Sequence, residues 1–209
     1  MIKILIADDH AIVRKGLEQL LLEEFPLAQI AGVQNSFEVF EKINEQIWDI
    51  ILLDISMQGQ NGIETLKQMR ANGVKTPVLI ISMHPEDQYA IRALKAGASG
   101  FLNKESATYE LLAAINKVMS GQKYITPSLA EILANNMFDS LEKTSDKQLS
   151  DREMQVLQLI ASGKTITEIA KKMFLSPNTI STYRVRILEK LNLKNSSEIT
   201  RYAIDNKLV

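Results

Sequence analysis

The stretch Ile2-Lys3-Ile4-Leu5-Ile6-Ala7-Asp8-Asp9 decides the fold, because a short apolar run that ends in two carboxylates is typical of a buried strand leading into a site. Three later apolar runs also end at polar residues: 50–53 before Asp54, 78–81 before Ser82, and 100–102 near Lys104. In an open parallel sheet, the carboxyl ends of the strands meet in one crevice. We therefore expect these side chains to converge on one pocket.

The carboxylates of this predicted pocket, Asp8, Asp9 and Asp54, indicate a bound cation, because like charges held close together repel one another. Oxygen ligands with spare coordination positions suit Mg²⁺, which keeps waters and is often shared with a phosphate. Beside such a cation, an aspartate can act as a nucleophile on a phosphoryl group. Lys104 offers a second positive contact, and the hydroxyl of Ser82 offers a hydrogen bond. The sequence therefore contains the parts of a phospho-aspartate site.

Residues 1–121 alternate between strand and helix patterns. Strands are expected at 2–7, 29–33, 50–53, 78–82 and 100–102. Helices are expected at 11–22, at 36–45 with Ser36 as N-cap, from the loop 56–62 to near 73, from Pro85 to near 97, and at 107–119. The alternation predicts an α/β fold, with a five-stranded, parallel, doubly wound (flavodoxin-like) sheet covered by helices on both faces.

The remainder of the chain reads as a linker and a small all-α domain. Residues 122–147 are predicted to be a linker with a helix near 127–138, followed by a polar tether over about 139–148. Residues 148–209 are predicted to form four helices, with capping boxes that start at Ser150 and Asn195. Ser176 is expected to cap the third helix, with Pro177 at its first position. Short helices joined by a brief turn are typical of a helix-turn-helix.

Composition and charge narrow the class of protein. The chain has 209 residues, a net charge of −1 and no cysteine, which excludes a disulfide framework and a thiolate metal site. Its apolar runs are too short for a signal peptide or a membrane span, so a cytoplasmic protein with no membrane partner is expected. Residues 146–209 carry a net charge of +4 and the rest −5. The basic tail favours an anionic partner such as nucleic acid, although so modest a charge also occurs by chance.

The pocket and tail motifs together resemble a known family. The chain resembles the receiver domain of two-component response regulators at Asp8-Asp9, Leu53-Asp54-Ile55-Ser56-Met57, Gly62, Ser82 and Lys104. It resembles a LuxR-type helix-turn-helix at residues 149–153, 167–170 and 175–180. This order and layout resemble the NarL/FixJ family over nearly the whole chain. Within it, Ser181-Thr182-Tyr183-Arg184 is nearest to a BvgA/EvgA-like branch.

The resemblance implies a role for each pocket residue. Asp54 is expected to accept a phosphoryl group from a cognate histidine kinase, and Lys104 to bind a phosphoryl oxygen. Ser82 and Phe101 are expected to form a switch pair, in which the hydroxyl moves toward the phosphoryl group and the ring rotates inward. Mg²⁺ is expected on Asp8, Asp9, Asp54 and the backbone carbonyl of Ser56.

The third predicted helix of the tail carries the expected DNA contacts. On a helix over 178–191, Ile180 and Ile187 fall on an apolar face, and Asn178, Thr182 and Val185 fall on the opposite one. A small polar face suits the major groove of double-stranded DNA. The resemblance places Ser181, Thr182 and Val185 nearest to the base edges. Contacts to phosphates are expected from Lys164, Thr179, Arg186, Lys190 and Lys194, for which the alternative is an ordinary solvated surface.

The sequence leaves the roles of Arg184 and of the fourth helix undecided. Arg184 falls near the buried stripe, and one interpretation is that it snorkels along the core and reaches a phosphate. The fourth helix offers an apolar surface that is either a dimer face or part of the core: Ile199, Tyr202, Ala203 and Leu208. A single helix-turn-helix buries little DNA surface, so a homodimer on promoter half-sites is expected after phosphorylation.

Near the predicted pocket, two residues differ from the family pattern, and one histidine stands at a position that the family uses for tuning. Gln58 and Glu105 stand where the family usually has proline, so the 104–105 peptide is expected to be either strained or trans. Neither departure removes a reacting group. Ser56 and His84 stand where the family tunes the lifetime of the phosphate, but a plain exposed loop is the favoured interpretation of His84.

Three rival functions are considered. A phosphatase with an aspartate nucleophile needs a second aspartate two residues later, where this chain has Ser56. A flavodoxin-like cofactor binder needs a Ser/Thr/Gly-rich loop after the first strand, where Asp8-Asp9-His10 would repel a phosphate. The third rival is a transcription factor that works without phosphorylation and keeps only a vestigial pocket. A phosphorylation-controlled transcription regulator is the preferred hypothesis.

Overall fold

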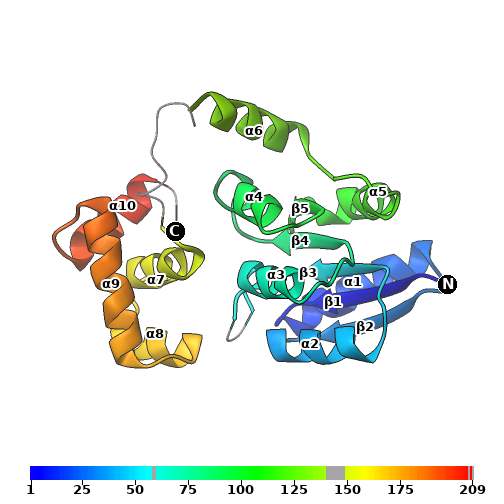
Figure 1. Ribbon diagram of the computed structural model, residues 1–209, viewed down its shortest axis with the longest axis horizontal. Coiled ribbons are helices and arrows are strands. Elements are labelled where there is room, and N and C mark those ends of the chain that lie inside the picture. Colours follow the sequence, from blue (N-terminus) through cyan, green and yellow to red (C-terminus); the bar gives the residue numbers. More distant parts are fainter. Residues whose placement is uncertain (58–59, 140–148, 207, 209) are drawn as a thin grey trace. The chain divides into compact units, whose positions relative to one another are not determined.

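The computed structural model describes residues 1–57, 60–139, 149–206 and 208. The chain divides into two units, Met1–Phe138 and Asp139–Val209 (Figure 1). Among the described residues, every helix is too short or too polar to cross a membrane.

The first unit contains the predicted parallel sheet. Its strands are β1 (Lys3–Ala7), β2 (Gln29–Val33), β3 (Ile50–Leu53), β4 (Val78–Ser82) and β5 (Gly100–Asn103). They pair in the order β2-β1-β3-β4-β5, and every pairing is parallel. The chain runs outward from β1 to β2 and then crosses to β3 on the other side of β1. The crevice between the ends of β1 and β3 is therefore the place where a doubly wound sheet binds ligands.

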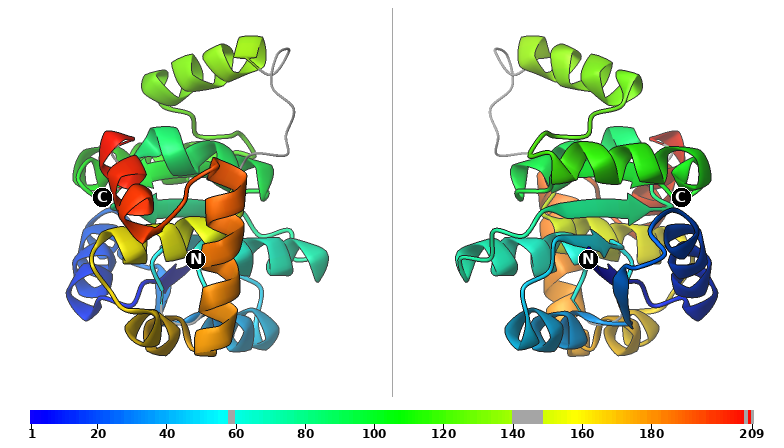
Figure 2. Two further views of the ribbon diagram at one scale, coloured as in Figure 1. Left: turned by 90° about the vertical axis from the view of Figure 1, so that its left-hand side faces the viewer. Right: turned by 90° about the vertical axis from the view of Figure 1, so that its right-hand side faces the viewer.

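Helices cover both faces of this sheet (Figures 1 and 2). The helices are α1 (Ala11–Glu24), α2 (Ser36–Glu45), α3 (Gly62–Ala71), α4 (Glu86–Lys95) and α5 (Ala107–Met119). On the face of α1 and α5, alternate strand residues such as Ile4, Ile6 and Leu52 pack against Leu21 and Ile115. The inner strands β1, β3 and β4 are buried on both sides, which explains why they read as continuous apolar runs, whereas the edge strand β2 is partly exposed.

The helix caps correct one detail of the sequence analysis. Ser36 is the first residue of α2, and its N-cap is Asn35, whose side chain accepts a hydrogen bond from the Glu38 N–H (3.0 Å). Asn61 caps α3 in the same way through Glu64 (3.0 Å). Asparagine and serine are equally good caps, so adjacent candidates are hard to distinguish from sequence.

The beginning of the predicted linker packs on the first unit. Tyr124 forms a parallel β-bridge with Gly100, and its hydroxyl donates to Glu110 Oε2 (2.7 Å). The predicted linker helix is α6 (Pro127–Asp139), and Leu129 in its first turn is fully buried. Thr126 donates to Glu86 at the start of α4 (2.7 Å). Residues 140–148 of the predicted tether lie outside the described part of the chain.

The second unit is all-α, as predicted. Its helices are α7 (Asp151–Ala161), α8 (Ile166–Met173), α9 (Pro177–Leu191) and α10 (Ser196–Asp205). They enclose a core made mainly of Leu149, Val156, Leu157, Ile160, Ile169, Ala170, Met173, Ile180, Ile187, Ile199 and Ala203. On α9, the buried residues Ile180 and Ile187 lie on the predicted apolar face, so helical periodicity was a sufficient guide to the packing of this helix.

The caps of the second unit follow the sequence signals with one exception. Ser150 and Glu153 form a complete capping box, and Ser176 caps α9 with Pro177 at its first position. At α10, Asn195 accepts from the Glu198 N–H (3.0 Å), but the Glu198 carboxylate accepts from Lys194 N (2.7 Å) rather than from Asn195. The predicted box at Asn195 is therefore only half formed.

Candidate functional site

Backbone hydrogen bonds continue past the ends of the strands and bring the predicted pocket residues together. Asp8 N donates to Val33 O (3.1 Å), Asp54 N to Ala7 O (2.8 Å), and Lys104 N to Ser82 O (2.9 Å). The sheet ladder itself thus holds these residues at one edge of the sheet, at the crossover between β1 and β3. This is the convergence that the apolar runs predicted.

The loop after Asp54 leaves no room for a side chain at Gly62. A Cβ built on Gly62 would lie 2.0 Å from the carbonyl oxygen of Asp54. Gly62 N donates to Ile55 O (3.0 Å), so α3 begins directly against the backbone that bears Asp54. A close backbone approach is one of the few uses that require glycine.

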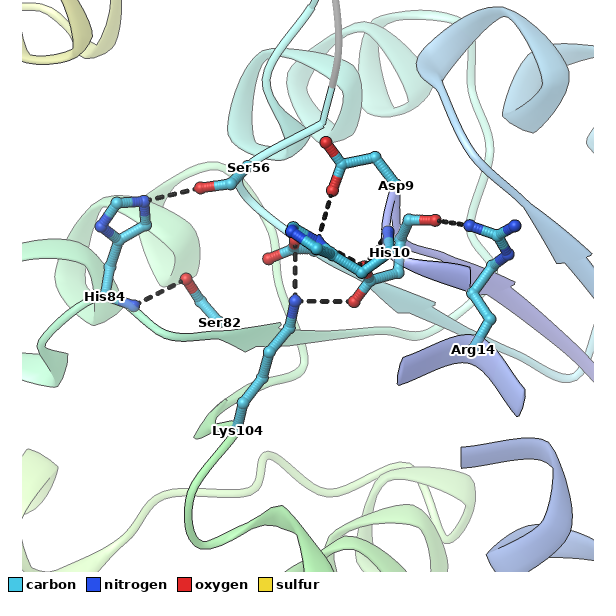
Figure 3. Close-up of polar contacts among 9 residues, drawn as sticks. Asp9, His10, Arg14, Ser56, Ser82, His84 and Lys104 are labelled. Carbon is cyan, nitrogen blue, oxygen red and sulfur yellow. Dashed lines mark hydrogen bonds and ion pairs between the residues drawn. The ribbon is translucent and has the colours of Figure 1, made fainter. Parts of the chain in front are cut away.

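Lys104 is held between two buried carboxylates (Figure 3). Its Nζ lies 2.6 Å from Asp8 Oδ2 and 2.9 Å from Asp54 Oδ2, and both aspartates are only 2% exposed. Burial raises the pKa of Asp54, with a smaller contribution from the charge of Asp8, and these effects outweigh the attraction of Lys104. Burial alone would lower the pKa of Lys104, but the two carboxylates raise it above its usual value, so this amine stays charged.

The acidic cluster has the composition of a divalent cation site. One ligand atom from each of Asp8, Asp9, His10 and Asp54 lies within 4.8 Å of the others. Asp54 Oδ1 is buried without a hydrogen-bond partner, which costs about 1–3 kcal/mol unless another group binds it. Three carboxylates and one ammonium leave an excess of two negative charges. The donor set therefore fits Mg²⁺, with Asp8, Asp9 and Asp54 as its side-chain ligands.

His84 lies against the pocket, which corrects the favoured interpretation of this residue as a plain exposed loop. Its Nε2 is 2.8 Å from Ser56 Oγ (Figure 3). Its ring also stacks on Tyr89, with 4.5 Å between the centroids. Burial and the positive charge of Lys104 lower the pKa of His84. The reason for the inward position is structural, because the His84 N–H also donates to Ser82 Oγ (3.1 Å) and closes the loop after β4.

The two predicted switch residues are both fully buried. Phe101 lies in β5 beside Ile80, and Ser82 ends β4. The movement of the Ser82 hydroxyl and of the Phe101 ring stays a prediction. The Lys104–Glu105 peptide is trans, because the described chain contains no cis peptide bond. Gln58, the other departure from the family pattern, lies outside the described residues.

The outer face of α9 presents most of the predicted DNA contacts to solvent. Asn178, Ser181, Thr182, Val185 and Arg186 are exposed, and Thr179 is half-buried. The Ser181 and Thr182 hydroxyls donate to the backbone one turn earlier, at Pro177 O and Asn178 O (3.0 Å each). Lys164 is exposed at the turn before α8. The exposed residues of α9 lie on its outer face, and Lys164 lies on a separate turn. The DNA contacts of all of them stay predictions.

Two basic residues of α9 make contacts inside the unit. Lys190 Nζ lies 2.7 Å from Glu153 Oε2, whose side chain is 3% exposed. The predicted phosphate contact of Lys190 therefore competes with an internal ion pair. Arg184 Nε donates to Ser196 Oγ (2.7 Å), which fastens α9 to the start of α10. The guanidinium of Arg184 therefore lies against the start of α10, and its contact with a phosphate stays a prediction.

The apolar surface predicted for the fourth helix packs inside the unit. Ile199 and Ala203 are fully buried, and Tyr202 and Leu208 pack against the same core. Of the two alternatives for this surface, the structure supports packing on the core.

Two contacts at the pocket were not anticipated from the sequence. His10 Nδ1 lies 2.7 Å from Asp9 Oδ1 and 3.3 Å from Asp8 Oδ1. Arg14, one turn into α1, donates to the backbone carbonyl of Asp8. The position of His10 directly after two carboxylates was the available signal, whereas nothing in the sequence distinguishes Arg14 from other basic residues of α1.

Two family models match this chain. Residues 4–116 match the response regulator receiver domain, and residues 147–203 match the bacterial regulatory proteins of the luxR family. Both matches fall where the sequence motifs and the two folded units lie.

Relatives with similar sequence and structure extend over the whole chain. Oxygen regulatory protein NreC of Staphylococcus epidermidis is 34% identical over 99% of both chains. Response regulator GacA of Pseudomonas syringae pv. syringae is 33% identical over 100% of this chain and 98% of its own. RcsB of Salmonella enterica serovar Typhimurium, solved bound to promoter P1flhDC in the presence of the phosphomimetic BeF3-, has a TM-score of 0.60 and 26% identity, covering 96% of this chain and 97% of that one.

Proposed function

We propose, from the premise that this chain belongs to the NarL/FixJ family of response regulators, that phosphorylation of Asp54 controls its action on promoters. The chain is a phosphorylation-controlled transcription regulator with a receiver domain and a LuxR-type DNA-binding domain. The proposal concerns the residues that perform these tasks. We also propose that the chain divides into a receiver domain over 1–121, a linker over 122–147 and a DNA-binding domain over 148–209.

One observation carries the assignment of the phosphoacceptor. Asp54 is a buried carboxylate with Oδ2 on Lys104 and with Oδ1 free of any hydrogen bond. A carboxylate oxygen without a hydrogen bond keeps its lone pairs available for attack on phosphorus. In the proposed step, an Asp54 oxygen forms a bond to phosphorus as the bond to the phosphohistidine nitrogen of a histidine kinase breaks. Lys104 then pairs with a phosphoryl oxygen.

Mg²⁺ is proposed as the cofactor of this step. When bound, it neutralises negative charge on the transferring oxygens. Asp8, Asp9, Asp54 and the carbonyl of Ser56 are the proposed ligands, and the excess negative charge of the cluster supports them. Lys104 holds two of these carboxylates at 2.6 and 2.9 Å, so it keeps them close together until a cation shares them.

The signal is proposed to pass through the end of β4. The Ser82 hydroxyl accepts a hydrogen bond from His84 N–H, and it must leave this donor to reach a phosphoryl group on Asp54. The loop that bears His84 leads into α4, whose first residue, Glu86, binds Thr126 before α6. Movement of Ser82 and Phe101 would therefore be transmitted toward the linker helix.

The proposed response is binding of a homodimer to promoter half-sites in the cytoplasm. The exposed face of α9 supports base contacts by Asn178, Ser181, Thr182 and Val185, and phosphate contacts by Thr179 and Arg186. The exposure of Lys164, at the turn before α8, supports a further phosphate contact. Lys190 is a weaker candidate, since Glu153 already binds its amine. The structure of RcsB bound to a promoter in the presence of a phosphomimetic supports this order of events for a relative.

The deciding experiment is phosphorylation of the full chain by a small phosphodonor with Mg²⁺. Wild type and Asp54→Asn are compared by intact mass, and the dimer fraction is measured by light scattering. We expect wild type alone to gain one phosphoryl group and to shift toward dimer. No gain in either protein, with promoter binding intact, would favour the alternative of a vestigial pocket and a regulator that works without phosphorylation.

A further inference from the structure

His10 adds a nitrogen atom to a pocket whose other side-chain donors are oxygens. Its Nδ1 lies 2.7 Å from Asp9 Oδ1 and 3.3 Å from Asp8 Oδ1, and the ring lies at the acidic end of the pocket in Figure 3. The side chain is 65% exposed, so its position is not explained by packing in the core. The backbone N–H of His10 donates to Asp8 Oδ1 (2.8 Å), so both the backbone and the ring of this residue lie against the carboxylates.

The oxygens of the pocket divide into two sets. Lys104 occupies Asp8 Oδ2 and Asp54 Oδ2. Asp8 Oδ1 and Asp9 Oδ1 lie beside the imidazole, and Asp8 Oδ1 also accepts a hydrogen bond from the His10 N–H (2.8 Å), whereas Asp54 Oδ1 is buried with no hydrogen-bond partner. This second set is therefore left for a cation even while Lys104 keeps its ion pairs.

The spacing of the second set suits direct ligation. Two atoms bound to one small cation at about 2.1 Å are at most about 4.2 Å apart. One ligand atom from each of Asp8, Asp9, His10 and Asp54 already lies within 4.8 Å of the others. The His10 side chain is 65% exposed, so the fold leaves room for its ring to turn toward a shared cation.

We propose that His10 is a fourth side-chain ligand of the pocket, and that it gives the pocket a preference for divalent transition ions such as Co²⁺ and Zn²⁺ over Mg²⁺. Imidazole is a strong ligand for transition ions, whereas Mg²⁺ prefers oxygen. The inference extends the proposed function, because it concerns the same carboxylates. A transition ion in this pocket occupies the ligands that Mg²⁺ needs for phosphoryl transfer.

The composition of the chain makes the proposal easy to test. There is no cysteine, and His10 and His84 are the two histidines. His84 lies on the other side of Ser56, where its Nε2 contacts the Ser56 hydroxyl rather than a carboxylate. His84→Asn is therefore the matched control for His10→Asn, because each variant removes one imidazole and keeps a polar amide.

The experiment titrates the full-length chain with MgCl₂, CoCl₂ and ZnCl₂ near neutral pH, by calorimetry and by the visible absorption of bound Co²⁺. We expect His10→Asn to weaken Co²⁺ and Zn²⁺ binding by about tenfold or more and to leave Mg²⁺ binding nearly unchanged. His84→Asn should keep the affinities of wild type. Circular dichroism of each variant confirms that the fold is retained.

Resonances of the two imidazole rings give a second reading. Added Zn²⁺ should shift the ring signals of His10 and not those of His84. Equal affinity of wild type and His10→Asn for Co²⁺, or loss of affinity in His84→Asn instead, would overturn the proposal. Phosphorylation of wild type with Mg²⁺ is scored separately, so the phosphoacceptor role of Asp54 and the ligand role of His10 can fail independently.

Discussion

In the first unit, Asp8 and Asp54 are each 2% exposed and share the amine of Lys104, whereas in α9 Val185 is 47% exposed and its polar neighbours face solvent. One site is built inside the fold from charges that must be paired. The other is a surface whose residues bind little besides their own backbone. A change in the first site should therefore alter folding stability as well as function, and a change in the second should alter binding alone.

The largest effect is expected from Lys104→Met, which removes the shared partner of two buried carboxylates. We expect the free energy of unfolding of the first unit to fall by about 3 kcal/mol, because an uncompensated buried charge remains. Urea unfolding followed by Trp48, the single tryptophan and a buried residue of this unit, measures the loss.

The matching control is the double variant Lys104→Met, Asp54→Asn. It removes one of the two unpaired charges and should recover part of the stability. Equal stability of Lys104→Met and wild type would show that the receiver site is as tolerant as the surface of α9, and the comparison would fail.

The variant Lys190→Met tests whether Lys190 stabilises the fold, as the buried charges of the first unit do, or acts only on the DNA-binding surface. Its amine binds the nearly buried Glu153, so we expect a loss of about 1–2 kcal/mol in the second unit, measured by hydrogen exchange of α7 and α9. Lys194→Met is the exposed control and should change stability little. A purely phosphate-binding Lys190 would weaken DNA binding and leave exchange rates unaltered.

The same pair predicts a dependence on pH. Burial alone would raise the pKa of Glu153, but hydrogen bonds from Lys190 and Ser150 outweigh it and hold the pKa below its usual value. The stabilisation is complete above the unfolded pKa of about 4.3, and it is lost as the pH falls through the lower folded pKa. Exchange protection of α7 should decline over that acid range in wild type and be flatter in Glu153→Gln.

A smaller effect is expected from Arg186→Met, a change on the exposed face of α9. We expect weaker promoter binding and a salt dependence reduced by about one unit of slope, with stability unchanged within about 0.5 kcal/mol. Fluorescence anisotropy at several salt concentrations measures the slope. A large loss of stability would contradict the division between buried and surface sites.

A small effect on stability and on signalling is expected from Thr126→Val, which removes the hydroxyl that donates to Glu86 and accepts from the Leu129 N–H in the first turn of α6. The hydrogen bond is half-exposed, so the first unit should lose about 0.5–1 kcal/mol by urea unfolding. If the contact passes the signal on, the gain in dimer after phosphorylation should also shrink. Ser120→Ala, on an exposed helix end, is the control.

The receiver pocket was predictable because the sheet does the positioning. Each reacting residue follows an apolar run, and β-ladder hydrogen bonds such as Asp54 N to Ala7 O bring the ends together. Side chains on loops were harder, as the inward position of His84 shows. It depends on the Tyr89 ring and on the Ser82 hydroxyl, and neither contact has a sequence period.

The second unit teaches the complementary lesson. Helical period identified the buried face of α9 and hence its outer face, but it could not tell which basic residues are free. Lys190 and Arg184 reach partners on α7 and at the start of α10, which are 37 and 12 residues away in sequence. Long side chains find such partners only once the helices are packed.

Gly62 has a consequence for genetics. It carries no reacting group, yet any side chain there would collide with the carbonyl of Asp54 at 2.0 Å. In a selection for regulator activity, random codons at position 62 should be rejected almost as strictly as codons at position 54. A position that tolerates no substitution in such a screen is therefore not necessarily one whose side chain takes part in the reaction. The two positions differ in the protein that results, since losing the carboxylate of Asp54 leaves the loop intact, whereas a side chain at position 62 displaces it.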